Sequence, residues 1–152
     1  MSSSSTRPQN AEPVLYTLVL ENRLDELTTV SEWINELASQ LGISPKGTFR
    51  VDLALAEAVT NIIDYAFDDE AEHSIEVTLQ YANHKATIQI TDDGKPFDPL
   101  QAPEVVLPRS LEEAQEGGLG IRLIRHYTDE CHYRRQDGKN LLSMVILDTV
   151  TE

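Results

Sequence analysis

The sequence predicts a two-layer α/β sandwich, with helices on one face of a mixed, mostly antiparallel sheet. Three observations support this: a short β-rich segment, two helical stretches after it, and then two hairpins of alternating strands. With 152 residues, the chain is long enough for one self-sufficient core and too short for a second domain of ordinary size. We therefore expect one domain over residues 14–150, preceded by a disordered tail over residues 1–13.

The first strand and the first helix are predicted from apolar patterning. Residues 14–20 form a short apolar run rich in β-formers, which is typical of a strand. Apolar residues then recur at intervals of three and four over residues 24–41, which predicts an amphipathic helix that ends at Gly42. Asn22 precedes this stripe and is the expected cap of the helix.

A second helix is predicted to begin at Ser44 and Pro45, since serine caps helices and proline suits the first turn. It continues to Phe67 with apolar residues on nearly all sides, so it should be buried. Glu57 and Asn61 are polar exceptions on this helix. A lone buried charge costs several kcal/mol, so the carboxylate must be paired, bound to a metal or catalytic.

The remaining chain is predicted to form two hairpins separated by a long connection. Alternating residues at 75–81 and 86–90 predict the first hairpin, and Asp137-Gly138 is typical of the turn of the second. Residues 95–117 are polar and proline-rich, which is typical of a lid. A glycine-rich turn then leads into a third helix, so the expected order is β-α-α-β-β-lid-α-β-β.

Composition narrows the range of partners. The chain has 12 Lys and Arg against 26 Asp and Glu, a net charge of −14, which argues against nucleic acid or an anionic membrane as partner. Its single cysteine, Cys131, argues against a disulfide framework or a thiolate zinc cluster. There is no apolar run of the roughly 20 residues that span a bilayer, and no signal-peptide pattern. We expect a cytoplasmic protein.

The first motif with chemical potential is the pair Glu57 and Asn61. At helical spacing i and i+4, both side chains project from the same face. The amide oxygen suits a hard cation such as Mg²⁺, which keeps several waters and shares the phosphates of a substrate. Taken alone, the pair is better explained by a polar surface edge or an internal hydrogen bond.

The second motif is Asp92-Asp93-Gly94, which directly follows a predicted strand. A carboxylate at the end of that strand can accept a hydrogen bond from an exocyclic amine such as that of adenine, and Gly94 allows a sharp turn. Because Asp, Gly and Pro are all turn formers, an ordinary turn is the competing interpretation.

The third motif is the glycine-rich segment 116–121 at the start of a predicted helix. Glycines let backbone N–H groups approach phosphates, and a helix N-terminus carries partial positive charge. In a chain of net charge −14, ATP would need Mg²⁺ and such local donors to bind. The segment is not a Rossmann fingerprint, which would require glycine at Leu123, and the chain contains no Walker P-loop. A plain glycine-rich helix start remains the alternative.

In this order and on these elements, the three motifs resemble those of the GHKL ATPase superfamily. Its nucleotide-binding domain has the Bergerat fold, which histidine kinases, gyrase-type ATPases and Hsp90 share. The sequence is most similar to the anti-sigma-factor serine kinases, over about residues 14–148. The segments that carry this similarity are EAVTN at 57–61, DDG at 92–94, PFDP at 96–99, EGGLGIRLI at 116–124, DE at 129–130 and YRR at 133–135.

The resemblance implies a role for each motif. Asn61 would coordinate Mg²⁺, Asp92 would recognise adenine, and Glu57 would be the general base that polarises a serine hydroxyl of a partner protein. Further nucleotide contacts are implied for Gly94, Phe97, Gly117, Gly118, Leu119, Gly120 and Ser143, the last standing on the strand where the family often has a threonine near the adenine.

By this resemblance, the protein is expected to be an ATP-binding anti-sigma regulatory factor with serine-protein kinase activity. Its expected partners are a sigma factor and a STAS-type anti-anti-sigma protein that it phosphorylates, and a homodimer is usual in the subfamily. Asp64 and Tyr65 stand where the family usually has Lys and His, so negative charge replaces positive near the expected phosphate site. The alternatives are a nucleotide-binding partner-switching regulator without kinase activity, and a detached histidine-kinase catalytic domain.

Overall fold

The computed structural model describes residues 14–69, 71–101 and 124–149. Its elements in chain order are β1 (Tyr16–Glu21), α1 (Glu26–Leu41), α2 (Pro45–Tyr65), β2 (Ser74–Ala82), β3 (Lys85–Asp92), the 3₁₀ turn η2 (Pro99–Gln101), β4 (Glu130–Gln136) and β5 (Lys139–Leu147). Residues 124–127 are also helical. The predicted lid therefore lies mostly outside the described residues, as do the predicted tail and the glycine-rich segment 116–121.

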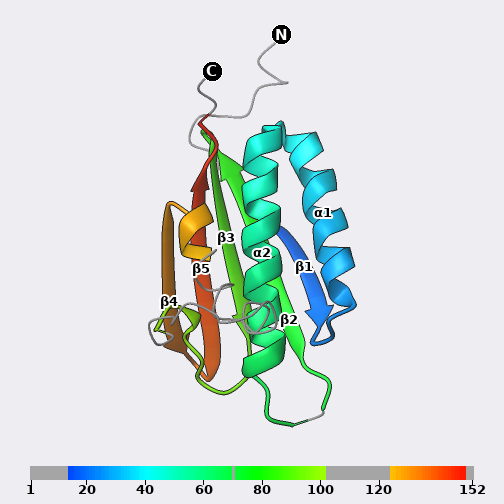
Figure 1. Cartoon of the computed structure of the whole chain (residues 1–152), viewed down its shortest axis with the longest axis vertical. Helices are drawn as coiled ribbons and strands as arrows, with labels where there is room; N and C mark the ends of the chain where they lie inside the picture. Colours follow the sequence, from blue (N-terminus) through cyan, green and yellow to red (C-terminus); the bar gives the residue numbers. More distant parts are fainter. Residues whose placement is uncertain (1–13, 70, 102–123, 150–152) are drawn as a thin grey trace, which may run out of the picture.

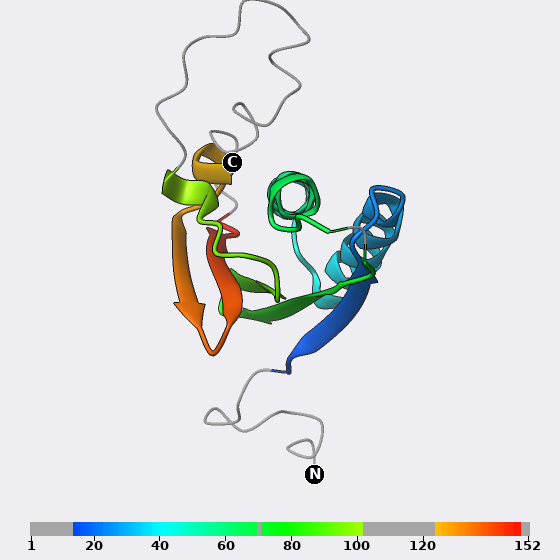
Figure 2. The ribbon, with the colours of Figure 1, turned by 90° about the horizontal axis from the view of Figure 1, so that it is seen from below.

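The described strands form one sheet in the order β1-β2-β3-β5-β4, with both long helices on the same face (Figure 1 and Figure 2). Each of the four neighbouring strand pairs is antiparallel. The predicted two-layer α/β sandwich is confirmed. Within the described ranges, neither α1 nor α2 has the stretch of apolar sequence that a helix needs to cross a bilayer.

The core lies between the sheet and α2. Along β2, β3 and β5, alternate residues are buried, and they face the helices because successive strand residues point to opposite faces. Tight turns close both hairpins, one at Asn83 and His84 and the other at Asp137 and Gly138, all with positive φ. The Asp-Gly hairpin predicted from the sequence is confirmed.

Helix α1 ends as predicted but does not begin as predicted. Its final cap is Gly42 in the left-handed conformation, with φ of 78°. Asn22 is not the N-cap, because the helix begins four residues later, at Glu26, and Asp25 occupies the cap position without a side-chain bond. Asn22 instead bonds the backbone of His73, accepting at Oδ1 from its N–H at 3.0 Å, and so fastens the β1–α1 connection to the start of β2.

Helix α2 begins as predicted. The Ser44 hydroxyl accepts from the N–H of Gly47 at 3.0 Å, and Pro45 occupies the first turn. The helix is buried where it packs on the sheet and on α1, but Phe49 is 58% exposed, so the expected burial does not extend all round. The core-facing residues of α2 are Val51, Ala54, Leu55, Ala58, Val59, Asn61 and Ile62.

Candidate functional site

The C-terminal end of α2 touches the turn that follows β3. The N–H of Lys95 donates to the carbonyl of Ala66 at 2.8 Å, directly beyond the helix. A Cβ atom on Gly94 would lie 2.4 Å from the same carbonyl oxygen, far closer than van der Waals contact allows. Gly94 is therefore required for the close approach of the turn to α2.

Asp92 is the last residue of β3 and is 3% exposed. Its Oδ1 accepts two hydrogen bonds, from the N–H of Gly94 at 2.8 Å and from Nδ2 of Asn140 at 2.9 Å. Its Oδ2 makes no hydrogen bond within the part of the chain that the structure describes. Burial raises the pKa of Asp92, and these two hydrogen bonds oppose that shift. The result is a buried carboxylate with one oxygen left to accept from a ligand.

Asn140 is a site residue that the sequence interpretation missed. It lies on β5 directly opposite Asp92 in the sheet register, and it is 4% exposed. A polar residue at a core-facing position of an alternating strand is the signal that would have found it. Its side chain bonds five groups: Asp92 Oδ1, the carbonyl of Lys95, the N–H of Phe97, the hydroxyl of Tyr133 and Nη1 of Arg135.

The predicted adenine contact at Ser143 is wrong, because this residue lies on the other face of the sheet. Ser143 pairs with Gln89 and His132, and it alternates with the buried residues Leu142 and Met144. Side chains along a strand alternate between faces, so Ser143 points away from α2 and from Asp92. Asn140, three residues earlier on the same strand, is the β5 residue that bonds Asp92.

Asn61 is a buried amide with an unmet hydrogen-bonding group. Its side chain lies in the core-facing stripe of α2 and is 1% exposed, and its Nδ2 has no partner among the described residues. It precedes Ala66 by five residues, or about 7.5 Å along the helix axis, so it lies near the contact with Gly94. An unsatisfied buried polar group costs about 1–3 kcal/mol, and such groups mark sites that a ligand completes.

The donor set around Asn61 fits a hard cation shared with a substrate. An amide oxygen is a ligand that Mg²⁺ accepts, and Mg²⁺ takes its other ligands from water and phosphate oxygens. The described ranges contain no group of three or more His, Cys, Asp and Glu that could hold a metal by themselves. A metal here would therefore depend on Asn61 together with the phosphates of a bound nucleotide.

Glu57 lies one turn before Asn61 on α2 and is partly buried. Burial raises the pKa of its carboxyl, and no hydrogen bond to the described residues stabilises its charge. A carboxylate in this condition accepts a proton more readily than one in water, as a general base must. Further along α2, Tyr65 packs on Phe97 with ring centroids 5.7 Å apart, so Phe97 covers the end of the helix.

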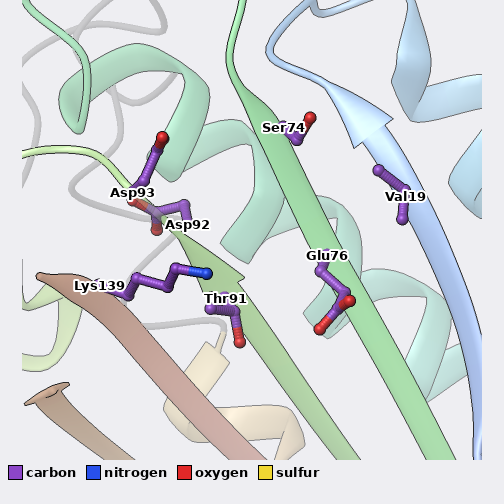
Figure 3. A pocket seen from close by; sticks show the side chains of 7 residues that line it. All are labelled: Val19, Ser74, Glu76, Thr91, Asp92, Asp93 and Lys139. Carbon is purple, nitrogen blue, oxygen red and sulfur yellow. The ribbon is translucent and has the colours of Figure 1, made fainter. Parts of the chain in front are cut away.

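A cavity of about 210 Å³ lies on the opposite face of the sheet (Figure 3). Glu76 and Thr91 are register partners on β2 and β3, and both alternate with core residues, so they point away from α2. Lys139 extends from β5 toward Thr91 across this face. Asp92 borders this cavity at the end of β3, but Glu76 and Thr91 line it from the face of the sheet that is turned away from Asn61, so the cavity does not join the predicted nucleotide residues. Its lining residues are Val19, Ser74, Glu76, Thr91, Asp92, Asp93 and Lys139.

The chain combines an antiparallel sheet under two helices with a buried aspartate at a strand end near a polar-bearing helix, which is the arrangement expected of a GHKL-type domain. The chain matches the family model of the histidine kinase-like ATPase domain over residues 20–146, and it belongs to this family. It is 34% identical over 128 residues to the serine/threonine-protein kinase BtrW of Bordetella bronchiseptica, covering 84% of this chain and 90% of that protein. It is 28% identical over 109 residues to the serine-protein kinase RsbW of Halalkalibacterium halodurans, covering 69% of this chain and 66% of that protein.

Two solved structures share the fold. One contains the RsbU and RsbW domains of Rv1364c from Mycobacterium tuberculosis, with a TM-score of 0.62 and 11% identity over 90% of this chain and 32% of that one. The other is the catalytic domain of the histidine kinase ThkA, with a TM-score of 0.51 and 13% identity; the match covers 91% of this chain and 97% of that one. These two likenesses concern the fold, while the family model and the named relatives group the chain with the GHKL-type serine/threonine protein kinases, as the motifs predicted.

Proposed function

We propose that the protein is an ATP-binding anti-sigma regulatory factor that phosphorylates a serine of a STAS-type anti-anti-sigma partner. Its other partner would be a sigma factor, which it would sequester in the cytoplasm. The observation that carries the proposal is buried Asp92, whose Oδ2 accepts no hydrogen bond from the described residues, near the end of the helix that bears Asn61. The name of the relative RsbW, a serine-protein kinase, supports serine as the acceptor, and that of BtrW, a serine/threonine-protein kinase, agrees with it.

Asp92 would recognise adenine. In its ionised form, Oδ2 accepts a hydrogen bond from the exocyclic amine of adenine, while Oδ1 stays bonded inside the protein. Gly94 and Phe97 shape this end of the pocket through the turn that contacts α2. Residues 117–120 lie outside the described residues, and their role as the phosphate loop remains part of the proposal.

The triphosphate end would be organised by Asn61. Its side-chain oxygen would hold Mg²⁺, which supplies neutralisation of phosphate charge when bound. Such neutralisation matters here because the chain carries a net charge of −14 and would otherwise repel ATP.

Glu57 would act as the base in phosphoryl transfer. It accepts the proton of the partner's serine hydroxyl while the serine oxygen forms a bond to the γ-phosphorus. The bond between that phosphorus and the β–γ bridging oxygen breaks, and ADP leaves with the electron pair. Burial raises the pKa of Glu57, so its carboxylate takes this proton more readily than an ordinary glutamate would.

The proposal is tested by incubating the protein with ATP, Mg²⁺ and a STAS-type acceptor and measuring acid-stable phosphoserine on the acceptor. We expect transfer by the wild type and a loss of at least about 100-fold in Glu57→Gln, with nucleotide affinity retained. Glu36→Gln is the matched control, because Glu36 is exposed on α1, and transfer should be unchanged. In Asn61→Ala, binding should lose its dependence on Mg²⁺.

Other outcomes select between the rival functions. Nucleotide binding without transfer would indicate a partner-switching regulator without kinase activity. The observation that favours this second function is the exposed carboxylate of Asp64, one turn beyond Asn61. Acid-labile phosphohistidine would indicate a detached histidine-kinase domain. Failure to bind any adenine nucleotide would overturn the proposal.

A further inference from the structure

Asp92 is held by a side chain to which no motif of the sequence assigned a role. We propose that Asn140 is a positioning residue that keeps the outer oxygen of Asp92 a hydrogen-bond acceptor, and thereby sets a preference for adenine over purines with a carbonyl at C6. This inference rests on the nucleotide site proposed above, and it adds the residue that determines base specificity.

The orientation of the Asn140 amide is fixed by its oxygen. That oxygen faces three donors: the N–H of Phe97 at 3.2 Å, Nη1 of Arg135 at 3.1 Å and the hydroxyl of Tyr133. The amide NH₂ could not take this place, because it would meet the N–H of Phe97 and the guanidinium of Arg135, which are donors only. The amide is therefore locked with its nitrogen toward Asp92.

The nitrogen of Asn140 in turn determines what Asp92 can do. It donates one hydrogen to Oδ1 of Asp92 at 2.9 Å and bonds the carbonyl of Lys95 at 2.8 Å. Oδ1 also accepts from Gly94, so it faces two donors and has no place for a proton of its own. Any proton on Asp92 must then sit on Oδ2, the oxygen that is open to a ligand.

The protonation state of Oδ2 would decide which base it can bind. An ionised Oδ2 accepts from the amine of adenine, whereas a protonated one donates to a carbonyl such as that of hypoxanthine. Burial and the neighbouring charge of Asp93 favour the protonated form, while the hydrogen bonds from Asn140 and Gly94 and the charge of Arg135 favour the ionised form. Asn140 thus helps to hold Asp92 in the state that recognises adenine.

The test compares the dissociation constants of ATP and ITP, each with Mg²⁺, by calorimetry between pH 5.5 and 8.5. In Asn140→Asp, a second carboxylate replaces the donor beside Asp92. We expect ATP affinity to fall about tenfold or more, the ATP-to-ITP preference to shrink, and the pH midpoint of ATP binding to rise. The serine side chain in Asn140→Ser is too short to bond Asp92 and adds no charge. This variant should also have a smaller preference for ATP over ITP.

Tyr133→Phe is the matched control. It removes one donor to the oxygen of Asn140 and leaves the bond from Asn140 to Asp92 in place. A purely structural role for this network predicts similar changes in Tyr133→Phe and in the Asn140 variants. The positioning role predicts a wild-type pH midpoint and a wild-type ATP-to-ITP preference in Tyr133→Phe. Thermal unfolding of each variant checks that it is folded.

Asp92→Asn separates failure of this inference from failure of the nucleotide site. If Asp92→Asn binds ATP as the wild type does, the proposed nucleotide site is wrong. If Asp92→Asn loses ATP but both Asn140 variants keep the wild-type preference and pH midpoint, the nucleotide site stands and the role of Asn140 is overturned.

Discussion

The two ends of α2 each meet a buried aspartate, and the two aspartates differ in their pKa. Asp148 follows β5 and meets the N-terminal end of the helix, whereas Asp92 ends β3 near the C-terminal end. Their exposures are similar, at 6% and 3%. Burial disfavours the charge on both, yet the pKa of Asp148 lies below its ordinary value and that of Asp92 lies above it.

The difference lies in how many oxygens the protein itself satisfies. Both oxygens of Asp148 are bonded: Oδ2 accepts from the N–H of Ser44 at 2.8 Å and from the hydroxyl of Tyr81 at 3.2 Å, and Oδ1 accepts from the Ser44 hydroxyl. The helix N-terminus also favours its negative charge. In Asp92, only Oδ1 accepts hydrogen bonds from the residues that the structure describes. A structural carboxylate is thus satisfied inside the protein, while the candidate functional one keeps an oxygen for a ligand.

The largest expected effect is on stability, from the same substitution at both positions. Asp148→Asn places an NH₂ group against donors and should lower the free energy of unfolding by about 3 kcal/mol. Asp92→Asn can keep both bonds to its oxygen and loses a buried charge, so its stability should stay within about 1 kcal/mol of wild type. Urea unfolding at pH 7 measures both.

The pH dependence of these variants sharpens the comparison. The lowered pKa of Asp148 means that its stabilisation is present above the ordinary value of 3.8 and is lost as the pH falls through the folded value. The gap between wild type and Asp148→Asn should therefore close in acid. The raised pKa of Asp92 has the opposite sign, so its ionisation lowers stability as the pH rises through the folded value. A gap that stays constant with pH would contradict this account.

A second prediction concerns the glycine at each end of α2. A Cβ on Gly47 would lie 2.4 Å from Oδ1 of Asp148, and a Cβ on Gly94 would lie 2.4 Å from the carbonyl of Ala66. Alanine at either position should cost about 2 kcal/mol of stability through overpacking. Only Gly94→Ala should also weaken ATP binding, since it displaces the turn that carries Asp92. Equal ATP affinities in the two alanine variants would contradict the division between a structural and a functional end.

The smallest expected effect is a pH-dependent contact beside the functional end. His73 lies between two carboxylates, with Nε2 2.7 Å from Asp69 and Nδ1 3.2 Å from Asp93. Both ring nitrogens can donate only when the imidazole is protonated. The bond to Asp69, with a further contribution from Asp93, raises the pKa of His73 above its ordinary 6.5. The stabilisation is therefore complete below pH 6.5 and is lost as the pH rises through the folded value.

The measurement is the thermal midpoint between pH 6 and 8. It should fall with rising pH more in the wild type than in His73→Gln. His132→Gln is the control, because the side chain of His132 is 73% exposed, and it should follow the wild type. Identical slopes in the wild type and His73→Gln would show that the contact does not contribute.

Features that depend on neighbours in the chain were predicted correctly. The Ser44 cap, the Gly42 stop and the Asp-Gly hairpin each rest on local backbone chemistry, so a few residues suffice to indicate them. The prediction for Asn22 failed because the helix begins at Glu26, four residues after Asn22, and a cap must stand directly before the first turn. Patterns locate elements better than they locate the ends of elements.

The candidate site also has features that the sequence determined and one that only the tertiary structure decided. The sequence by itself determined the order of the elements, the side-chain chemistry of Glu57, Asn61 and Asp92, and the family to which the chain belongs. Only the tertiary structure decided that Asn140, and not Ser143, stands beside Asp92. The physical reason is that strand register sets which face a side chain occupies, and a shift of one residue reverses that face. Register comes from pairing between strands that are far apart in the chain.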